Sequence, residues 1–398
     1  MSNPSPSAEL RIFSALADLP AAAWNALVEK HGGNQPFLRH EFLNAFEATG
    51  CVGESKGQHT GWQPAHITLW EKGSLVGAMP AYLKYHSYGE YVFDWAWADA
   101  YQRNGLDYYP KLLAAIPFSP ITGARLLTDT PARKALLAQG AIAAARELGA
   151  SSFHCLFPLD EEIAPLQHAG MLTRHGTQFH WQNKPGTGYA SFDEFLATFT
   201  REKRKKIKQE RRKVAEAGIT FEWFTGTQGN HALRDEHWTF LHQCYRNTYR
   251  LHRSTPYLNL DFFRLLGQRM PDNCLIVIGS RNEKPLCAAF NIYDRTTLWG
   301  RYWGALETIP NLHFETCYYQ ALEFCIARNI QLFEGGAQGE HKLARGLMPE
   351  QTQSMHWLAH PEFSEAVEQF LEREQRGVAG YIEELKEHAP FRKLGQNS

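Results

Sequence analysis

Apolar and polar residues alternate in several short runs of the first half of the chain, a pattern typical of half-buried β-strands. The runs "AHITLW" and "LVGAMPAYLKY" flank the polar turn "EKGS" and predict a β-hairpin. We expect "YVFDWAW" to form a further strand and "SSFHCLF" to form a buried one. The remaining spacing predicts helices near 21–29, 40–48, 107–116 and 132–148, and a short strand near 124–128.

The second half of the chain runs through the same order of elements. "CLIVIGS" turns into "PLCAAFNIY", and "TLWGRYWG", a helix over 312–328 and the strand "IQLFE" follow. A shift of 210 positions superposes the two hairpins and aligns Tyr108-Tyr109 with Tyr318-Tyr319. We infer a duplicated unit and therefore an α+β fold of two lobes, each a mixed, mainly antiparallel sheet flanked by helices. Two unrelated α/β halves are the alternative.

A strongly basic segment joins the halves. Ser191, followed three positions later by Glu194, is a capping box, and Gly218 fits a helix end, so we expect one helix between them. From Arg201 to Lys213 nine Lys or Arg residues stand against two Glu, a local charge of +7. This favours contact with phosphates of tRNA, a nucleotide or a lipid, although a solvated helix face would look similar. Near the C-terminus, residues 361–390 predict an amphipathic docking helix, with an interruption near Gly377 or Gly380 left open.

The stretch "FEGGAQGEHKLARG", residues 333–346, concentrates chemical groups directly after a predicted strand. Its glycines allow backbone N–H groups to approach a ligand closely. Its acids and histidine can transfer protons, and Lys342 and Arg345 can bind anions. The spacing matches neither a Walker A motif nor a dinucleotide-binding fingerprint. A polar loop with an Arg/Glu network is the alternative.

A second candidate lies in "GRYWGALETIPNLHFETCYY". Asn311 stands where a helix N-cap belongs, and His313 and Glu315 follow in the first turn. His313 could equally be a capping or packing residue. We expect the loop 334–345 and the helix start 311–315 to share a pocket.

Composition narrows the function classes. The 398 residues carry a formal net charge of −1, which argues against a surface coated in positive charge for general nucleic-acid binding. Seven cysteines without a CxxC pair are typical of reduced thiols, and neither a signal peptide nor an 18-residue apolar run occurs, so we expect a cytoplasmic protein. His313 and Glu315, two positions apart on a helix, do not form a metal pair. We expect no metal and no covalent nucleophile; the oligomeric state stays open.

The motifs "GRYWG", "NLHFETCYYQALEFCIARNI", "FEGGAQGEHKLARG" and "HAPFRK" resemble the Fem-like N-acyltransferase family of bacteria, which is related to peptidoglycan biosynthesis and to tandem GNAT acyltransferases. This resemblance implies two GNAT-like lobes, residues 8–185 and 186–398, the second beginning with the basic helix. It also implies transfer of an acyl or aminoacyl group from acyl-CoA or aminoacyl-tRNA to a primary amine. Either donor would be a substrate, with no tightly bound cofactor.

We therefore expect an N-acyltransferase, and our alternative is a non-catalytic module that binds tRNA or an anionic cell-wall precursor. The candidate proton acceptors are Glu315, Glu334, Glu340 and His341. The candidate substrate- and phosphate-binding residues are Arg301, Tyr302, His313, Gly335, Gly336, Gln338, Gly339, Lys342, Arg345, Arg204, Lys205 and Lys208.

Overall fold

The computed structural model describes residues 8–55, 57–337 and 339–392, and the chain divides into two compact units. Unit 1 runs up to Gly176 and includes Thr352–Ala379, and unit 2 consists of Thr177–Gln351 and the chain from Gly380 onward. The chain passes between the units inside β11 (Leu172–Gln182), β17 (Met348–Leu358) and α12 (Pro361–Glu387). The sequence interpretation placed a single boundary at 185/186 and did not include the return of 352–379 to unit 1.

Unit 1 contains two sets of paired strands. The antiparallel set has the order β1 (Glu9–Phe13), β5 (His66–Glu71), β6 (Ser74–Met79) and β9 (Leu127–Thr128). The second set has the order β4 (Trp62–Pro64), β7 (Ala81–Lys84), β8 (Lys111–Ala114), β10 (Ser152–Leu156) and β17, with β8 and β10 parallel. A separate small pair is formed by β2 (Glu54–Ser55) and β3 (Gln58–His59).

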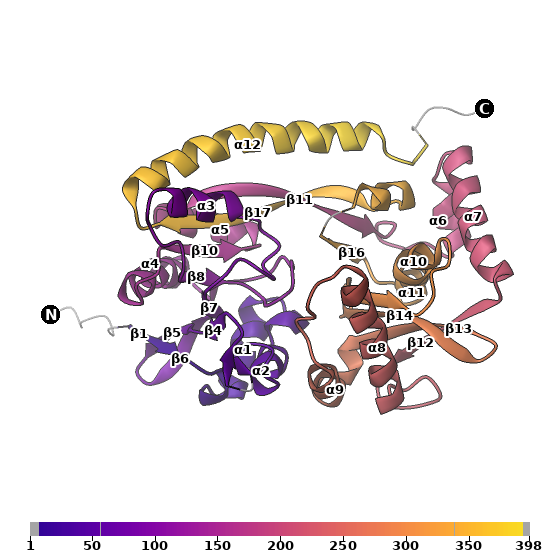
Figure 1. The fold of residues 1–398 in the computed structure, drawn as a ribbon, viewed down its shortest axis with the longest axis horizontal. Coiled ribbons are helices and arrows are strands. Elements are labelled where there is room, and N and C mark those ends of the chain that lie inside the picture. The colour runs from indigo at the N-terminus through magenta and orange to yellow at the C-terminus, as the bar shows by residue number, and fades with distance from the viewer. Residues whose placement is uncertain (1–7, 56, 338, 393–398) are drawn as a thin grey trace. The chain divides into compact units, whose positions relative to one another are not determined.

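The helices of unit 1 cover these strands (Figure 1). They are α1 (Ala21–His31), α2 (His40–Ala48), α3 (Trp95–Arg103), α4 (Pro131–Glu147) and α5 (Asp160–His168), with short 3₁₀ turns at Leu16–Asp18 and Pro36–Leu38. The expected hairpin, the helices at 21–29, 40–48 and 132–148, and the buried strand "SSFHCLF" are confirmed.

Two expectations for unit 1 are wrong. "YVFDWAW" is no strand, because its last three residues open α3 after a loop. The helix expected over 107–116 is the strand β8, whose four residues are all buried. A strand covered on both faces loses the alternation that distinguishes it from a buried helix, so its apolar run was misread.

Unit 2 is built on one six-stranded sheet. Its order is β12 (Ile219–Thr225), β13 (Cys274–Arg281), β14 (Lys284–Tyr293), β15 (Thr297–Ala305), β16 (Leu332–Ala337) and β11. All neighbours are antiparallel except β15 and β16. The helices are α6 (Phe192–Ala197), α7 (Arg201–Glu216), α8 (Asp235–Leu251), α9 (Leu260–Arg269), α10 (Leu312–Phe314), the π-helical turn η4 (Glu315–Tyr319), α11 (Gln320–Ala327), and the 3₁₀ helices η3 (Pro271–Asn273) and η5 (Glu340–Arg345).

The two faces of this sheet carry different helices. Phe195 of α6, Tyr318 of η4 and Phe324 of α11 belong to one apolar cluster with Leu298 and Phe333 of the sheet. On the other face, α8 packs with Trp238 on Phe290 of β14 and with Tyr245 on Tyr302 of β15. The sheet therefore separates two distinct layers of helices, and each face can carry its own chemistry.

The basic linker forms two helices, not the single helix expected. Ser191 caps α6 as predicted, because its Oγ accepts a hydrogen bond from the Glu194 N–H at 3.1 Å. The chain then leaves the helix at Phe199, which forms a β-bridge with Phe391. Since the backbone there pairs with the C-terminal segment, it cannot continue the helical ladder.

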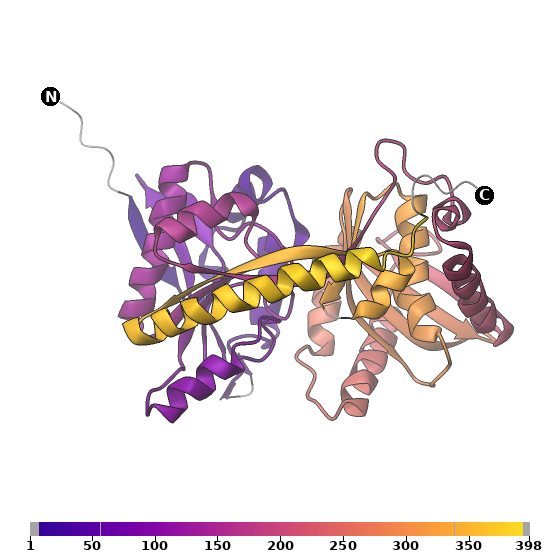
Figure 2. The same cartoon turned by 90° about the horizontal axis from the view of Figure 1, so that it is seen from above.

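The structure agrees only in part with the duplication inferred from the sequence. The hairpins β5–β6 and β13–β14 correspond at the offset of 210. The tyrosine pairs do not, because Tyr108-Tyr109 precede a strand whereas Tyr318-Tyr319 lie in the π-helical turn. In α12 the ribbon is continuous through Gly377 and Gly380 (Figure 2).

Two buried charged side chains, Arg125 and Glu162, organise the loop before β9 in unit 1 through hydrogen bonds to its backbone. Arg125 is fully buried, and its guanidinium donates to the carbonyl oxygens of Ile121, Gly123, Ala124 and Leu156. The Glu162 carboxylate accepts hydrogen bonds from the N–H groups of Arg125, Leu126 and Leu159. Loss of the guanidinium leaves buried carbonyl oxygens without a donor and removes the positive charge that acts on the buried Glu162.

We predict that Arg125→Leu lowers the free energy of unfolding by about 3 kcal/mol or more. Urea denaturation of the full chain measures this change. Arg103→Leu is the matched control, because the Arg103 side chain is exposed on α3, and it should stay within about 0.5 kcal/mol of the wild type. Equal effects of the two changes would contradict the structural role of Arg125.

Candidate active site

Two parallel strands of unit 2 part near the middle of the sheet. β15 and β16 pair at Thr297–Leu332, Leu298–Phe333 and Trp299–Glu334, and their ladder ends there. On its other edge β15 pairs with β14 as far as Ala305, and β16 pairs with β11. A shift in the β14–β15 register leaves Arg301 as the extra, bulged residue at the point of parting. The ladder between β15 and β16 therefore ends at Trp299 and Glu334, and beyond these residues the two strands form the arms of a fork.

A histidine cluster spans both arms of this fork on the α11 face of the sheet. The His313 ring lies 4.6 Å from the Trp303 ring of β15 and 5.9 Å from the His341 ring of η5. Tyr318 places its hydroxyl 3.0 Å from Nε2 of His341, and the Phe314 ring lies 5.7 Å from the His341 ring. The glycine-rich loop and the helix start, which the sequence analysis expected to meet, are thus in direct contact.

Two cations of η5 hold this cluster in place. Lys342 donates from Nζ to the Gly336 carbonyl of β16 at 2.7 Å. Arg345 donates from Nη1 to the His341 carbonyl at 2.6 Å and from Nη2 to the Glu210 carboxylate at 2.9 and 3.1 Å. Both side chains are buried, so their contacts here are to the protein itself.

The electrostatics keep the imidazoles neutral at pH 7. Burial, aided by the neighbouring positive charges, lowers the pKa of His313 to about 4. Burial also lowers the pKa of His341, and Lys342 and Arg345 lower it further. Lys342 itself has its pKa lowered to about 8 by burial. A neutral His341 has a ring nitrogen that can accept a proton.

Glu334 lies on the opposite face of the sheet. Phe333 packs in the α11 layer, and successive strand residues point to opposite faces, so Glu334 belongs to the layer of α8. It is only 6% exposed, and burial raises its pKa to about 8, while the Trp299 indole and the Arg301 guanidinium oppose that shift. The structure therefore separates Glu334 from the histidine cluster.

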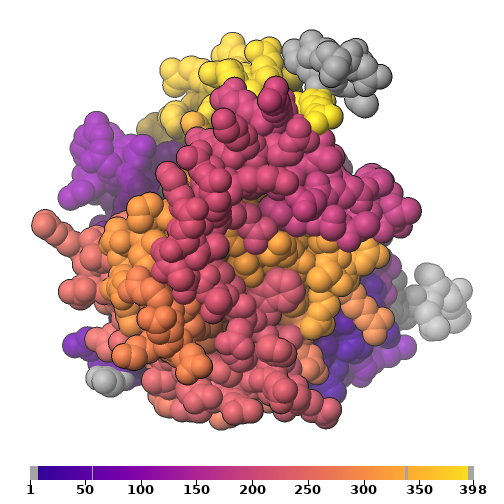
Figure 3. All heavy atoms as spheres, turned by 90° about the vertical axis from the view of Figure 1, so that its right-hand side faces the viewer, coloured from indigo at the N-terminus to yellow at the C-terminus, as the bar shows by residue number. Residues whose placement is uncertain are grey.

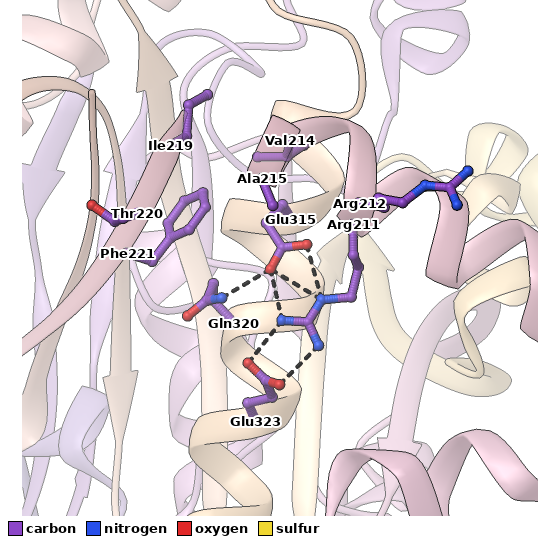
Figure 4. A pocket seen from close by; sticks show the side chains of 10 residues that line it. All are labelled: Arg211, Arg212, Val214, Ala215, Ile219, Thr220, Phe221, Glu315, Gln320 and Glu323. Atoms are coloured by element: carbon purple, nitrogen blue, oxygen red, sulfur yellow. Dashed lines mark hydrogen bonds and ion pairs between the residues drawn. The ribbon is translucent and has the colours of Figure 1, made fainter. Parts of the chain in front are cut away.

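The carboxylates of Glu315 and Glu340 have partners other than His341. Glu315 is buried and forms an ion pair with Arg211 of α7, with Nη2 and Oε1 2.9 Å apart (Figure 4). Glu340 is exposed and accepts a hydrogen bond from the Tyr381 hydroxyl at 2.8 Å. In the described part of the chain, neither carboxylate forms a hydrogen bond or an ion pair with His313 or His341.

The remaining predicted residues distribute as follows. Arg301 and Tyr302 stand on β15, where Tyr302 packs on Tyr245. Gly335 and Gly336 lie in β16, which ends at Ala337, and Gly339 directly precedes η5. Gly336 and Gly339 have φ of 80° and 110°, which favour glycine. Gln338 lies outside the described residues.

Helix α7, which carries Arg204, Lys205 and Lys208, lies on the molecular surface shown in Figure 3. Lys205 is exposed, Arg204 is half-buried, and Lys208 forms an exposed ion pair with Asp193 at 2.9 Å. All three side chains project from α7, and among the described residues none of them contacts His313 or His341.

Several residues of the site were missed by the sequence analysis. Tyr318 was noted only as part of a tyrosine pair, and Glu210 and Arg211 were counted only as part of the charge run. Glu210 accepts hydrogen bonds from both Arg345 and the Tyr319 hydroxyl. The partners of Glu210 and Arg211 lie more than a hundred positions away in the sequence, so no local pattern reveals these two residues.

A second polar cluster, in unit 1, was also missed. Lys111 is fully buried and binds Glu90 at 2.8 Å and Asp94, and Lys84 lies 3.7 Å from Glu90. Burial lowers the pKa of Lys84 to about 7 and raises that of Glu90 to about 6. A lysine inside an otherwise apolar strand, as in "AYLK" and "KLLA", is the signal that could have indicated it.

Within the described ranges, no group of three or more His, Cys, Asp and Glu side chains is arranged to hold a metal ion. None of the helices in the described part of the chain is both long and apolar enough to cross a bilayer.

The fold is similar to that of solved structures of low sequence identity. FemX aligns with a TM-score of 0.51 and 10% identity, over 88% of this chain and 98% of its own. L-PGS from Bacillus licheniformis gives 0.51 and 10%, over 88% and 97%. A tandem GNAT protein from the clavulanic acid biosynthesis pathway gives 0.45 and 10%, over 89% and 99%. The expected α+β class, with mixed, mainly antiparallel sheets flanked by helices in two units, is confirmed.

No curated protein matches the chain. A family model does match, over residues 15–393, and it is that of the FemAB-like proteins, described as peptidoglycan biosynthesis/recognition. The resemblance drawn from the sequence motifs is thereby confirmed. The chain belongs to the FemAB-like family of peptidoglycan biosynthesis and recognition.

Proposed function

We propose that this protein is an N-acyltransferase that moves an acyl or aminoacyl group from an activated donor to a primary amine. The observation that carries the proposal is the histidine cluster that spans the two arms of the β15–β16 fork. His313 packs on Trp303 of one arm, Lys342 binds the Gly336 carbonyl of the other, and His341 lies between them. Membership of the FemAB-like family supports the same chemistry.

His341 is the group best suited to remove the proton in this reaction. The amine nitrogen attacks the donor carbonyl carbon and forms a tetrahedral intermediate, and it must then lose a proton. The His341 side chain is exposed. Because its pKa is lowered, its ring is neutral at pH 7 and can accept the proton of the amine. The C–O bond of an aminoacyl ester, or the C–S bond of a thioester, then breaks, and the leaving oxygen or sulfur takes up the proton that His341 accepted from the amine.

The fork supplies donors for the carbonyl oxygen. The β15–β16 ladder ends at Trp299 and Glu334, so the backbone N–H groups of the inner edges beyond that point lie along the opening between the two strands. Such preoriented N–H groups stabilise the developing oxyanion without having to reorganise. The Arg301 guanidinium lies over the Tyr302 ring and acts on Glu334, so its charge belongs to the α8 face and not to the side of His341.

Helix α7 bears on the choice of donor. Its exposed residues include Arg201, Lys205, Lys206 and Lys213, and an exposed positive face of this kind attracts phosphates. The exposed positive face of α7 favours aminoacyl-tRNA over acyl-CoA as the donor. The same positive face is the observation behind the alternative function, a non-catalytic module that binds tRNA or an anionic precursor. The proposed compartment is the cytoplasm, where both donor classes are made.

We predict that His341→Gln lowers kcat/KM for acyl transfer by about 10²- to 10⁴-fold, because the proton acceptor is lost. The assay presents aminoacyl-tRNA and acetyl-CoA in turn with a panel of primary amines and detects the amide product by mass spectrometry. His252→Gln, an exposed histidine after α8, is the matched control and should keep full activity. Unchanged transfer by the His341 variant would contradict its role, and tRNA binding without any transfer by the wild type would favour the binding module.

As the pH is lowered, the rate of acyl transfer should begin to fall only below pH 6.5, the ordinary pKa of histidine. His341 must be neutral to accept a proton, and its pKa is lowered from 6.5. As the pH falls, activity should therefore persist through pH 6.5 and decline only at the lower pKa of His341. A profile of kcat/KM against pH measures this decline. With an amine substrate whose own pKa lies below the scanned range, a midpoint at or above 6.5 would exclude His341 as the proton acceptor.

The stability of the protein should depend on Glu334. Both folded and unfolded chains hold its proton below pH 4.5, but between 4.5 and about 8 only the folded chain does. The free energy of unfolding should therefore fall by about 1.4 kcal/mol per pH unit across this window from this group, and Glu334→Gln should remove that component. Urea denaturation at a series of pH values compares the slopes. Identical slopes for variant and wild type would show that Glu334 is ionised in the folded protein.

A further inference from the structure

A cavity of about 560 Å³ lies in unit 2 outside the histidine cluster, between α7, β12 and the segment of η4 and α11 (Figure 4). One wall is apolar and the other is charged. Val214 of α7 and Ile219 and Phe221 of β12 form the apolar wall. Arg211, Glu315 and Glu323 form the charged wall.

The charged wall holds two carboxylates for one guanidinium. Arg211 donates from Nη1 and Nη2 to Glu323 at 2.8 and 2.9 Å, and from Nη2 and Nε to Glu315 at 2.9 to 3.2 Å. Gln320 donates to Glu315 Oε1 at 2.8 Å and accepts a hydrogen bond from Trp223, which fixes its amide. This wall therefore carries a net charge of −1.

The other arginine of the cavity does not reverse this sign. Arg212 points away from the ion pairs in Figure 4, and its Nε lies 3.5 Å from the Glu216 carboxylate. An anion entering the cavity would meet two carboxylates and a guanidinium whose every nitrogen already donates to them. A phosphate group, which the charge of α7 suggested from the sequence, does not suit this cavity.

A cation that enters the cavity would be attracted by the net negative charge of this wall. The Glu323 side chain is 30% exposed, and its two oxygens accept one hydrogen bond each from Arg211, so both keep lone pairs for a further donor. The apolar wall across the cavity can bury an alkyl or aromatic body at the same time. We propose that this cavity binds a protonated primary amine that carries an apolar body, with Glu323 pairing the ammonium group. This inference does not depend on the proposed transfer reaction.

The backbone at the cavity supports a binding role. Glu315 is the first residue of the π-helical turn, and such turns occur often at functional sites because they re-aim side chains within a helix. The same turn carries Tyr318, whose hydroxyl contacts His341. One π-helical turn thus carries both a residue of the cavity wall and a residue that contacts His341.

Binding of simple probes to the full chain tests the proposal. Isothermal titration should show that hexylamine binds about ten-fold or more tightly than hexanol, and that hexanoate does not bind. Glu323→Gln should weaken hexylamine about ten-fold, and Ala215→Phe, which fills the cavity from α7 without touching the ion pairs, should abolish binding. Glu236→Gln, an exposed change on α8, is the control and should bind hexylamine as the wild type does.

Three results would overturn the proposal. Hexanoate binding as tightly as hexylamine would show an anion site. Equal affinities of the Glu323 and Glu236 variants, or binding that persists in Ala215→Phe, would place the amine elsewhere. Absence of binding by every probe would show that the cavity holds only a structural ion-pair network.

Discussion

The ion pair between Arg345 and Glu210 is the interaction on which the candidate active site depends. Arg345 joins three segments: its guanidinium binds the carboxylate of α7, donates to the His341 carbonyl of η5, and lies 3.3 Å from the centre of the Phe314 ring. Both partners are buried, and loss of one would leave the other charge without compensation, at a cost of about 3 to 5 kcal/mol. The position of His341 against Tyr318 follows from this anchor.

The basic helix α7 therefore has more than one role. Glu210 and its neighbour Arg211 turn inward, one towards the histidine cluster and the other towards the pair of Glu315 and Glu323. Lys205 and Lys206 remain exposed. A charge run that looks uniform in the sequence is thus divided by the helical period into a structural face and a solvent face. The π-helical turn lies where the structural face meets the sheet.

Local patterns predicted the parts of the molecule that depend on local interactions. The hairpins, the helix from 312 to 327 and the meeting of His313 with His341 could be predicted, because strand periodicity and a glycine-rich turn after a strand are short-range signals. The strand β8 could not, since burial on both faces removes its alternation. Glu210 and Arg211 could not be distinguished from solvated charges, because their partners come from elements far along the chain.

The most direct test of the account asks whether the donor lies along the fork of β15 and β16. Hydrogen exchange of the full chain can be followed by mass spectrometry with acetyl-CoA or with a non-hydrolysable aminoacyl-tRNA analogue, whichever binds. The account predicts slower exchange of backbone N–H groups over residues 300–305 and 335–337 once the donor is bound. Donor binding with unchanged exchange in both segments would contradict it.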